Sequence, residues 1–414
     1  MSKWHKYLLF FLGTLSGLSF ATHFEIPHVN STDTKPATIK VLLHEMMEGA
    51  IVEVKGKFQV CNIENNKYLS GGRSNKRFFL FPHPDGLKWG ETYPGIYQIR
   101  IVPLSAETTT LIDGIEYRGC IEVYNIEGKL YFVNEVDIES YIKSTLSTEF
   151  SVKPPIDILD SIAILARTNA YYIAGKNSDR FWHVRGVNNG YYGNANTLVH
   201  PYIDRSVDAT KYLILTYEEK PFPTTWTENC AGKTASYSTV FQRNVVTPPG
   251  ITSEFTQKDR NSTQWKYTIS VQEISRLLKM NCVTAIQLFT DSSSNKVHTI
   301  QMRDGNHIQN LTFIELQDLL GKKNIESNDF TVSLQGKEFI FKGFGKGLGC
   351  GLCLSSAREM VQRGDNTPQI LARFFPYTQL LKAISSPENF FVRTSDKNEF
   401  FCHDPRCRMR HAMR

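Results

Sequence analysis

Glu149 is the residue of this chain whose type and setting best fit acid–base chemistry. Apolar residues recur at helical spacing between positions 138 and 146, so a helix is expected there, and Asp137 is suited to cap it. Glu149 then falls near the helix end, where the negative end of the dipole and the apolar Phe150 would favour the protonated acid. A general acid needs that proton. On these residues alone, a solvated glutamate at a helix terminus is the favoured interpretation.

Arg167 is the second residue with chemical interest. It lies in a mostly apolar helical run, residues 158–171, where a guanidinium is costly unless it is paired or reaches a cleft. A structural ion pair would meet that requirement, and so would contact with a cleft.

The elements around these two residues indicate a mixed α/β protein of the α+β type. Short apolar runs that alternate with polar residues, separated by Gly, Asn and Pro, predict a β-rich part over residues 39–125. A catalytic core of helices and further strands, with a groove beside the Glu149 helix, is expected over residues 126–380. Further helices are expected at 271–279, 313–320, 355–364 and 368–375. Residues 381–414 form a basic tail with a Cys pair.

The N-terminus has the three regions of a secretory signal peptide, residues 1–21. Lys3, His5 and Lys6 precede an apolar run, and small residues close it at Ser19 and Ala21. The run is short for a membrane span, which needs about 20 apolar residues. We therefore expect cleavage after Ala21, a linker over residues 22–38, and export to the periplasm or cell envelope. Membrane association is expected only if the signal is retained.

Composition adds only broad limits. A net charge of +6 in 414 residues suits an anionic polymer or membrane surface, and is far from a nucleic-acid footprint. Eight cysteines in an exported chain suggest disulfides or free thiols. The spacing of Cys350 to Cys353, and of Cys402 to Cys407 with His403 between them, also permits zinc, which is the less favoured interpretation. The other cysteines are Cys61, Cys120, Cys230 and Cys282.

Several segments, in order, resemble the family that includes the sporulation protein SpoIID and the amidase enhancer LytB. The family pattern Val-Asn-x-Leu-x-Leu-Glu-x-Tyr-Leu followed by a Glu-Met pair is similar to residues 133–142 and 146–150, which end in Glu149 and Phe150. A helix with an Ala-Ala-Arg-Thr-Tyr-Ala-like run corresponds to residues 163–171. Weaker matches are residues 230–234, 265–271 and the glycine-rich block 347–356. Together they span roughly residues 40–378.

The resemblance implies a peptidoglycan lytic transglycosylase, with Glu149 as its acid and base and no cofactor. Such enzymes cut the bond between N-acetylmuramic acid and N-acetylglucosamine and close a 1,6-anhydro ring, so one carboxyl group suffices. The implied substrate is a glycan strand stripped of its peptides, with an N-acetylmuramoyl-L-alanine amidase as functional partner. Arg167, Lys233, Tyr191 and Tyr192 are the implied substrate-binding residues. Lys233 could equally be a turn lysine, and the two tyrosines could equally pin their loop to the core.

The glycine-rich block departs from the family pattern at Cys350, Cys353 and Ser356, where the family has His, Gly and Gln. The loop after the Arg167 helix lacks the cysteine that some relatives have there, so the zinc site of those relatives is not supported. Close backbone packing is the plain interpretation of residues 343–351. These changes keep open the alternative of a glycan-binding amidase activator without turnover. The eight cysteines keep open a third function, that of a disulfide-stabilised envelope protein.

Overall fold

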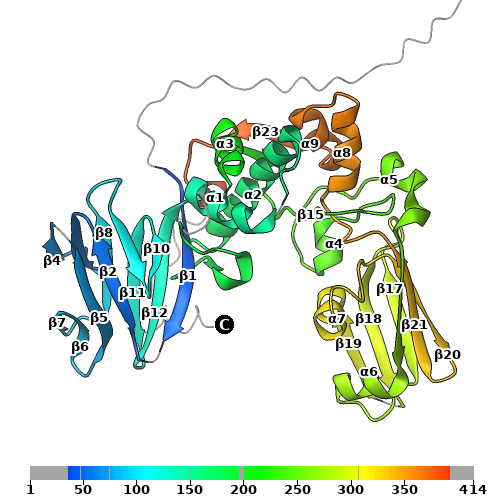
Figure 1. Ribbon diagram of the computed structural model, residues 1–414, viewed down its shortest axis with the longest axis horizontal. Coiled ribbons are helices and arrows are strands. Elements are labelled where there is room, and N and C mark those ends of the chain that lie inside the picture. The colour runs from blue at the N-terminus through cyan, green and yellow to red at the C-terminus, as the bar shows by residue number, and fades with distance from the viewer. Residues whose placement is uncertain are drawn as a thin grey trace, which may run out of the picture.

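The computed structural model describes residues 36–391, apart from residues 47, 74, 151, 195–199 and 306. Figure 1 shows three parts in a row: two β-sheets formed by the first strands, a central group of helices, and a smaller α/β part formed by residues 264–344. The protein is therefore mixed α/β with a β-rich N-terminal part, as the sequence predicts. The predicted signal peptide, most of the predicted linker, Cys402, Cys407 and the basic tail beyond residue 391 lie outside the described residues.

Two sheets make up the N-terminal part. They share one hydrophobic core because their inward positions alternate with outward ones; along β1, Ile39, Val41 and Leu43 are buried in that core. The seven-stranded sheet has the order β13 (Val184–Arg185), β1 (Thr38–Met46), β12 (Lys129–Asp137), β11 (Cys120–Ile126), β8 (Gln98–Pro103), β3 (Phe58–Asn62) and β4 (Tyr68–Gly72). The six-stranded sheet has the order β10 (Ile115–Tyr117), β9 (Thr109–Ile112), β2 (Ala50–Lys55), β5 (Lys76–His83), β6 (Gly86–Trp89) and β7 (Glu91–Pro94).

The central helices continue directly from the sheet. Strand β12 ends at Asp137, whose side chain accepts a hydrogen bond from the backbone N–H of Ser140 at 2.9 Å and so caps α1 (Ile138–Glu149) as predicted. Helix α2 (Ile156–Lys176) packs against α1, α3 (Pro201–Ala209), α8 (Leu354–Gln362), α9 (Thr367–Phe374) and β14 (Leu213–Thr216). Strand β14 pairs with β23 (Gln379–Lys382), and β15 (Trp226–Thr227) pairs with β22 (Leu352–Cys353).

Helix α2 begins at Ile156 with Pro155 as its N-cap residue, so Asp157 lies inside its first turn. Its carboxylate accepts a hydrogen bond from the backbone N–H of Thr367 at 3.0 Å, and so ties the start of α9 to α2. Short helices connect the larger elements: η1 (Val187–Asn189), α4 (Tyr237–Phe241), α5 (Glu254–Lys258), η2 (Arg260–Thr263) and η3 (Pro387–Phe390).

Residues 264–344 form a part with a hydrophobic core of its own. Two three-stranded antiparallel sheets carry a helix each, and the chain enters and leaves along neighbouring strands, because β16 pairs with β21. The elements are β16 (Gln264–Ser270), α6 (Val271–Leu278), β17 (Ala285–Thr290), β18 (Val297–Asp304), β19 (His307–Thr312), α7 (Phe313–Leu320), β20 (Phe330–Gln335) and β21 (Glu338–Phe344). Helices α6, α7, α8 and α9 lie where the sequence predicts helices.

Candidate active site

Glu149 is the last residue of α1, and its side chain is exposed. The apolar face of α1, which includes Ile138, Ile142 and Leu146, is buried in the core, so the helix is held along its length while its end reaches the surface. Trp226 of β15 donates a hydrogen bond from its indole N–H to Oε1 of Glu149, with 3.2 Å between the two atoms. Two segments 77 residues apart in the chain therefore meet at this carboxyl group.

Two hollows meet at Glu149 and Trp226, because both residues line both of them. One hollow, of about 490 Å³, extends from Glu149 toward α8 and is called the basic hollow here. The other, of about 350 Å³, extends along α1 and α2 and is called the neutral hollow. Glu149 thus stands at the middle of a groove with room on either side of its carboxyl group.

The basic hollow takes its name from Lys153, Lys346 and Arg358. Arg358 is paired with Glu228, the second carboxyl group in this hollow, at 2.7 Å between Nη1 and Oε1. The remaining lining is Phe150, Val152, Pro154, Pro155, Thr227, Gly347, Leu348 and Leu354, in addition to Glu149 and Trp226.

The neutral hollow has no charged residue other than Glu149 among its described lining residues. It offers hydroxyl and amide groups from Thr145, Thr148, Asn169, Asn188, Asn189, Thr224 and Thr225, beside Tyr141, Ile142, Leu146, Ala166, Gly190 and Trp226. Gly190 packs against the end of α1: its φ is 63°, and a Cβ there would lie 2.4 Å from Oγ1 of Thr148. The loop of Asn188 and Asn189 is therefore held close to Glu149 by a position that suits glycine.

Arg167 does not line either hollow. It is fully buried on the far side of α2, and its Nε and Nη2 atoms donate to the two carboxylate oxygens of Glu139 at 2.8 and 2.7 Å. The other guanidinium N–H groups reach the carbonyl oxygens of Val207 and Leu213 and the hydroxyl of Thr210. All its donors are thus used inside the protein, which is the structural ion pair that the sequence left open.

The three other sequence candidates also lie outside the two hollows. Nζ of Lys233 donates to the carbonyl oxygen of Ser293 at 2.9 Å, in the α/β part. Tyr191 is 5% exposed, and its hydroxyl donates to Oδ1 of Asn134 at 2.6 Å, so it pins its loop to the sheet. Tyr192 is exposed.

Comparison of the sequence with known proteins identifies the family of the chain. The sequence pattern of the SpoIID family, described as stage II sporulation protein, matches residues 126–217, which include α1 with Glu149, α2 and the loop of Asn188 and Asn189. An uncharacterized protein of Chlamydia pneumoniae is 30% identical over 209 residues, which are 50% of this chain and 76% of the relative.

The chain belongs to the SpoIID family.

A second relative extends the similarity along the chain. An uncharacterized protein of Brachyspira hyodysenteriae is 27% identical over 343 residues, 81% of this chain and 91% of the relative. A third, from Chlamydia muridarum, is 33% identical over 180 residues, 43% of this chain and 62% of the relative. The SpoIID family implies a cell-wall-related role, and it is associated with peptidoglycan-degrading activity.

In this member of the SpoIID family, the glycine-rich block packs against the strand that carries Trp226. Strand β15 pairs in parallel with β22, with Trp226 opposite Leu352. Gly351 has a φ of 74°, and a Cβ there would lie 2.0 Å from the carbonyl oxygen of Thr225; a Cβ on Gly347 would lie 2.4 Å from Oγ1 of Thr227. The block therefore serves close backbone packing, and it fixes the strand that presents Trp226 to Glu149.

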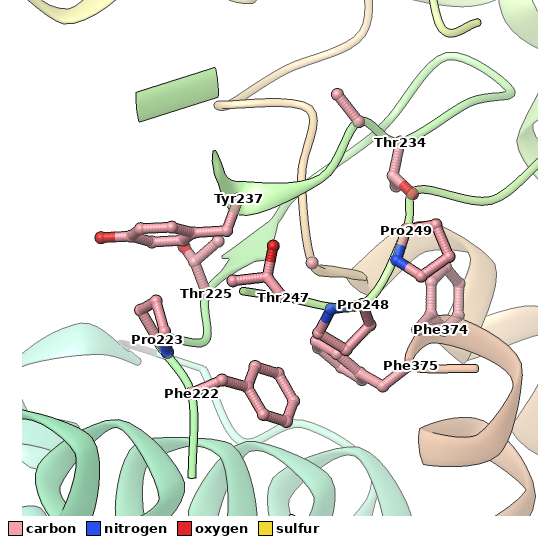
Figure 2. A pocket seen from close by; sticks show the side chains of 12 residues that line it. Phe222, Pro223, Thr225, Thr234, Tyr237, Thr247, Pro248, Pro249, Phe374 and Phe375 are labelled. Atoms are coloured by element: carbon pink, nitrogen blue, oxygen red, sulfur yellow. The ribbon is translucent and has the colours of Figure 1, made fainter. Parts of the chain in front are cut away.

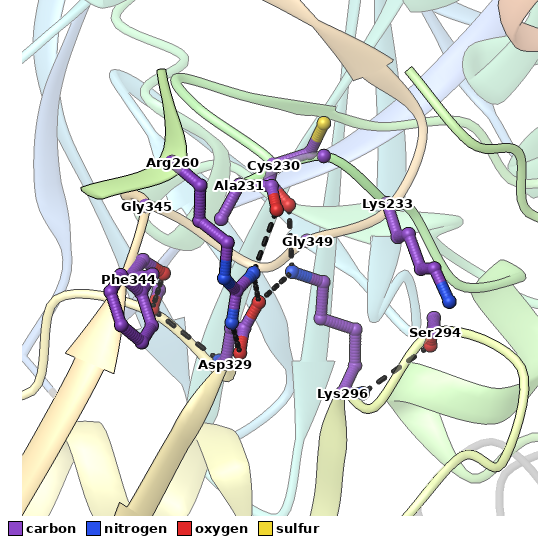
Figure 3. A network of polar contacts seen from close by, with 12 residues as sticks. Cys230, Ala231, Lys233, Arg260, Ser294, Lys296, Asp329, Phe344, Gly345 and Gly349 are labelled. Carbon is purple, nitrogen blue, oxygen red and sulfur yellow. Dashed lines mark hydrogen bonds and ion pairs between the residues drawn. The ribbon is translucent and has the colours of Figure 1, made fainter. Parts of the chain in front are cut away.

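A buried polar network holds the chain that follows Trp226. Figure 3 shows Lys296 and Arg260 converging on Asp329 and on the backbone at Cys230 and Ala231. Nζ of Lys296 is 2.9 Å from Oδ2 of Asp329 and 2.7 Å from the carbonyl oxygen of Cys230. Because Lys296 and Asp329 come from the α/β part, this network joins that part to the strand that presents Trp226.

The two altered cysteines of the block are fully buried beneath the groove. The backbone N–H of Cys230 and the hydroxyl of Ser356 each lie 3.3 Å from Sγ of Cys353. Burial opposes ionisation of Cys353, but hydrogen bonds from the Cys230 thiol and from Ser356 outweigh it and lower the pKa of Cys353. Six described cysteines are free thiols, and no three metal-binding side chains gather in the described part of the chain.

A further gap, lined by aromatic, proline and threonine residues, is too small for a substrate. It has a volume of about 20 Å³, room for roughly one water molecule, and Figure 2 shows Phe222, Tyr237, Pro248 and Phe375 around it.

Within the described residues, no helix is both long and apolar enough to cross a membrane.

The sequence singles out Glu149 but misses the residues around it. Asn169 is a polar residue in an apolar helical run and could have been noticed there. Trp226 gives no such signal, since a tryptophan in a sequence does not reveal whether it is buried or faces a groove. Lys346 is adjacent to the glycine-rich block, but only the pairing of distant segments places it beside Glu149.

Proposed function

We propose that this chain is an exported bacterial lytic transglycosylase. It cleaves the bond between N-acetylmuramic acid and N-acetylglucosamine in peptidoglycan strands and forms 1,6-anhydro-N-acetylmuramic acid. The observation that carries the proposal is the position of Glu149, exposed at the junction of two hollows that can hold sugars on both sides of one bond. Membership in the SpoIID family supports the substrate class.

The contact with Trp226 supports separate roles for the two oxygens of Glu149. An indole N–H can only donate, so Oε1 acts as the acceptor and the proton of the acid resides on Oε2. Among the described residues, Oε2 accepts no hydrogen bond, so it is the oxygen available to a substrate.

One carboxyl group completes the reaction. Glu149 gives its proton to the oxygen of the glycosidic bond, and the bond between that oxygen and the anomeric carbon breaks. The 6-hydroxyl oxygen of the same muramic acid then bonds to that carbon, and its proton passes to the Glu149 carboxylate. The acid is restored and no water is consumed. Glu228 is not needed as a second catalytic group. Its ion pair with Arg358 suits a structural role in the lining of the basic hollow.

The cellular setting is part of the proposal. The signal-like N-terminus supports export to the periplasm or cell envelope. The strands acted on are those from which an N-acetylmuramoyl-L-alanine amidase has removed the peptides, so that this amidase is the functional partner.

The test is an incubation of the purified mature protein with peptide-free glycan strands, beside the Glu149→Gln variant. Mass spectrometry detects anhydro ends, whose mass is lower than that of hydrolysed ends by one water. We expect anhydro products from the wild type and a rate lower by about 10²- to 10⁴-fold in the variant, since the variant lacks the acid and base. Glu228→Gln is the matched control in the same hollow and should retain most of the rate.

The competing function is a glycan-binding activator of an amidase. It would show as strand binding without anhydro products, equal in the wild type and Glu149→Gln. Hydrolysed ends in place of anhydro ends would contradict the proposed reaction type while leaving peptidoglycan as the substrate.

A further inference from the structure

The two hollows differ sharply in charge, although they meet at the same carboxyl group. The basic hollow contains the cations Lys153, Lys346 and Arg358 and the acids Glu149 and Glu228. The neutral hollow contains Glu149 alone as a charged residue among its described lining. A ligand that lies across both must therefore present different chemistry to each.

Two of the three cations are not neutralised by the protein. Arg358 is paired with Glu228, whereas neither Lys153 nor Lys346 forms a salt bridge with a described residue. Nζ of Lys153 lies 6.0 Å from the centre of the Tyr202 ring. With three cations against two acids, the basic hollow has an excess of positive charge close to the reacting group.

Lys346 differs from an ordinary surface lysine because its backbone is fixed. Its N–H and C=O groups pair with the backbone of Asn229, and its carbonyl oxygen also accepts a hydrogen bond from Oγ1 of Thr227 at 2.9 Å. Gly345 and Gly347 on either side have φ values of 79° and 105° and pack tightly on the segment after Trp226. The base of the Lys346 side chain is therefore held at the rim of the groove.

A peptide-free glycan strand has a matching alternation. Every second sugar carries a carboxylate, and the sugar between carries an uncharged acetamido group as its most polar substituent. Amide and hydroxyl side chains can both donate to and accept from an acetamido group. The carboxylate nearest the broken bond belongs to the sugar on which the new ring closes.

We propose that the basic hollow is the subsite for the carboxylate-bearing sugar on which the ring closes, and that the neutral hollow holds the uncharged N-acetyl sugar beyond the broken bond. This rests on the function proposed above. Lys346 and Lys153 are the specificity-determining residues, and they fix the direction in which a strand lies across Glu149. A strand that retains its peptides has an amide in place of each carboxylate and lacks the charge that these lysines bind.

The experiment measures binding in the Glu149→Gln background, so that turnover is not required. Isothermal titration calorimetry compares peptide-free strands with the same strands after every carboxylate has been converted to a neutral methylamide. We expect the charged strands to bind more tightly, by roughly two- to fivefold for each lysine engaged, and the difference to shrink as salt is raised.

Lys346→Gln and Lys153→Gln should each lower the affinity for charged strands and leave the affinity for methylamide strands unchanged. The unchanged affinity also shows that the variants are folded. Lys233→Gln is the matched control, because that lysine lies outside both hollows and its Nζ is bound to Ser293. It should alter neither affinity.

The two proposals fail in different ways. Equal binding of charged and methylamide strands, unaffected by Lys346→Gln, would overturn the charge subsite and leave the proposed function standing. Absence of binding to both strands would overturn the proposed function and the subsite with it.

Discussion

The two sides of Glu149 are built in different ways. The neutral hollow is formed mostly by neighbouring elements, α1, α2 and the loop of Asn188 and Asn189, which lie within the residues matched by the SpoIID family. The basic hollow is formed by residues 149–155 together with residues 226–228 and 346–358, which are far apart in the chain. One wall follows from local sequence, whereas the other depends on long-range pairing.

The α/β part explains how the second wall is assembled. Residues 264–344 lie between Trp226 and Lys346 in the chain, yet β16 and β21 pair with each other and return the chain close to its starting point. The network of Lys296, Asp329 and Arg260 then fixes this part to the strand after Trp226. The comparison teaches that the catalytic carboxyl group and the surface proposed to bind charge belong to separate structural units.

The largest effect that tests this comparison is expected among the helices that form the neutral hollow. Arg167→Met removes the fully buried partner of an ion pair and leaves the largely buried Glu139 carboxylate without it, which should lower the free energy of unfolding by about 3–5 kcal/mol. Chemical denaturation measures this change. Because Arg167 lies outside the groove, the rate of anhydro-product formation per folded molecule should stay close to that of the wild type.

Two controls make the prediction sharp. Arg276→Met removes an exposed pair with Glu273 and should change the stability by less than about 0.5 kcal/mol. Adding Glu139→Gln to Arg167→Met should recover part of the loss, since the buried charge is then removed as well. A fully stable Arg167→Met protein with a large loss of rate would instead place Arg167 in the catalytic machinery.

The second effect concerns the basic hollow, which is formed by segments far apart in the chain. Gly351→Ala puts a Cβ 2.0 Å from the carbonyl oxygen of Thr225 at a φ of 74°, so the strand of Trp226 must move. We expect a loss of about 2–3 kcal/mol in stability and a lower rate of anhydro-product formation, because Trp226 no longer meets Glu149 in the same geometry.

Gly364→Ala is the matched control for this change. Gly364 has a φ of 94° with no other atom within 4 Å of an added Cβ, so it isolates the cost of backbone conformation, about 1 kcal/mol. Its rate should be normal. Identical stability and rate in the two variants would show that the packing of the glycine-rich block does not control the groove.

The same division decides how much could be predicted from the sequence. The mixed α/β class, helix α1 with its Asp137 cap and helices α6 to α9 follow from periodicity and capping, which are properties of neighbouring residues. The two-sheet arrangement does not, because strand order is set by pairing between segments that no periodicity identifies. The separate core of residues 264–344 was likewise hidden, because the helices predicted at 271–279 and 313–320 do not reveal which segments pack together.

The candidate site shows the same limit. The sequence presents Glu149 as the catalytic candidate through the resemblance to the SpoIID family, and the residues that place it form one helix. It also presents Arg167, Lys233, Tyr191 and Tyr192 as candidates, but whether a polar side chain faces a groove or the protein interior depends on partners such as Glu139 and Asn134. Trp226 and Lys346 reach the groove through backbone pairing of distant segments, so nothing local could have revealed them.

The smallest expected effect concerns the contact between Trp226 and Glu149, where the segments that form the two hollows meet. Trp226→Phe keeps an aromatic ring beside Phe150, whose ring centre lies 6.4 Å from that of Trp226, but removes the indole N–H that donates to Glu149. A hydrogen bond to a charged group contributes about 1.5–3 kcal/mol, and its exposed position reduces that value here. We expect a roughly fivefold lower rate of anhydro-product formation, with a smaller change in strand affinity in the Glu149→Gln background because an aromatic ring is kept in the groove. An unchanged rate would mean that α1 orients Glu149 without help from Trp226. The distant segments that line the basic hollow would then serve substrate binding alone.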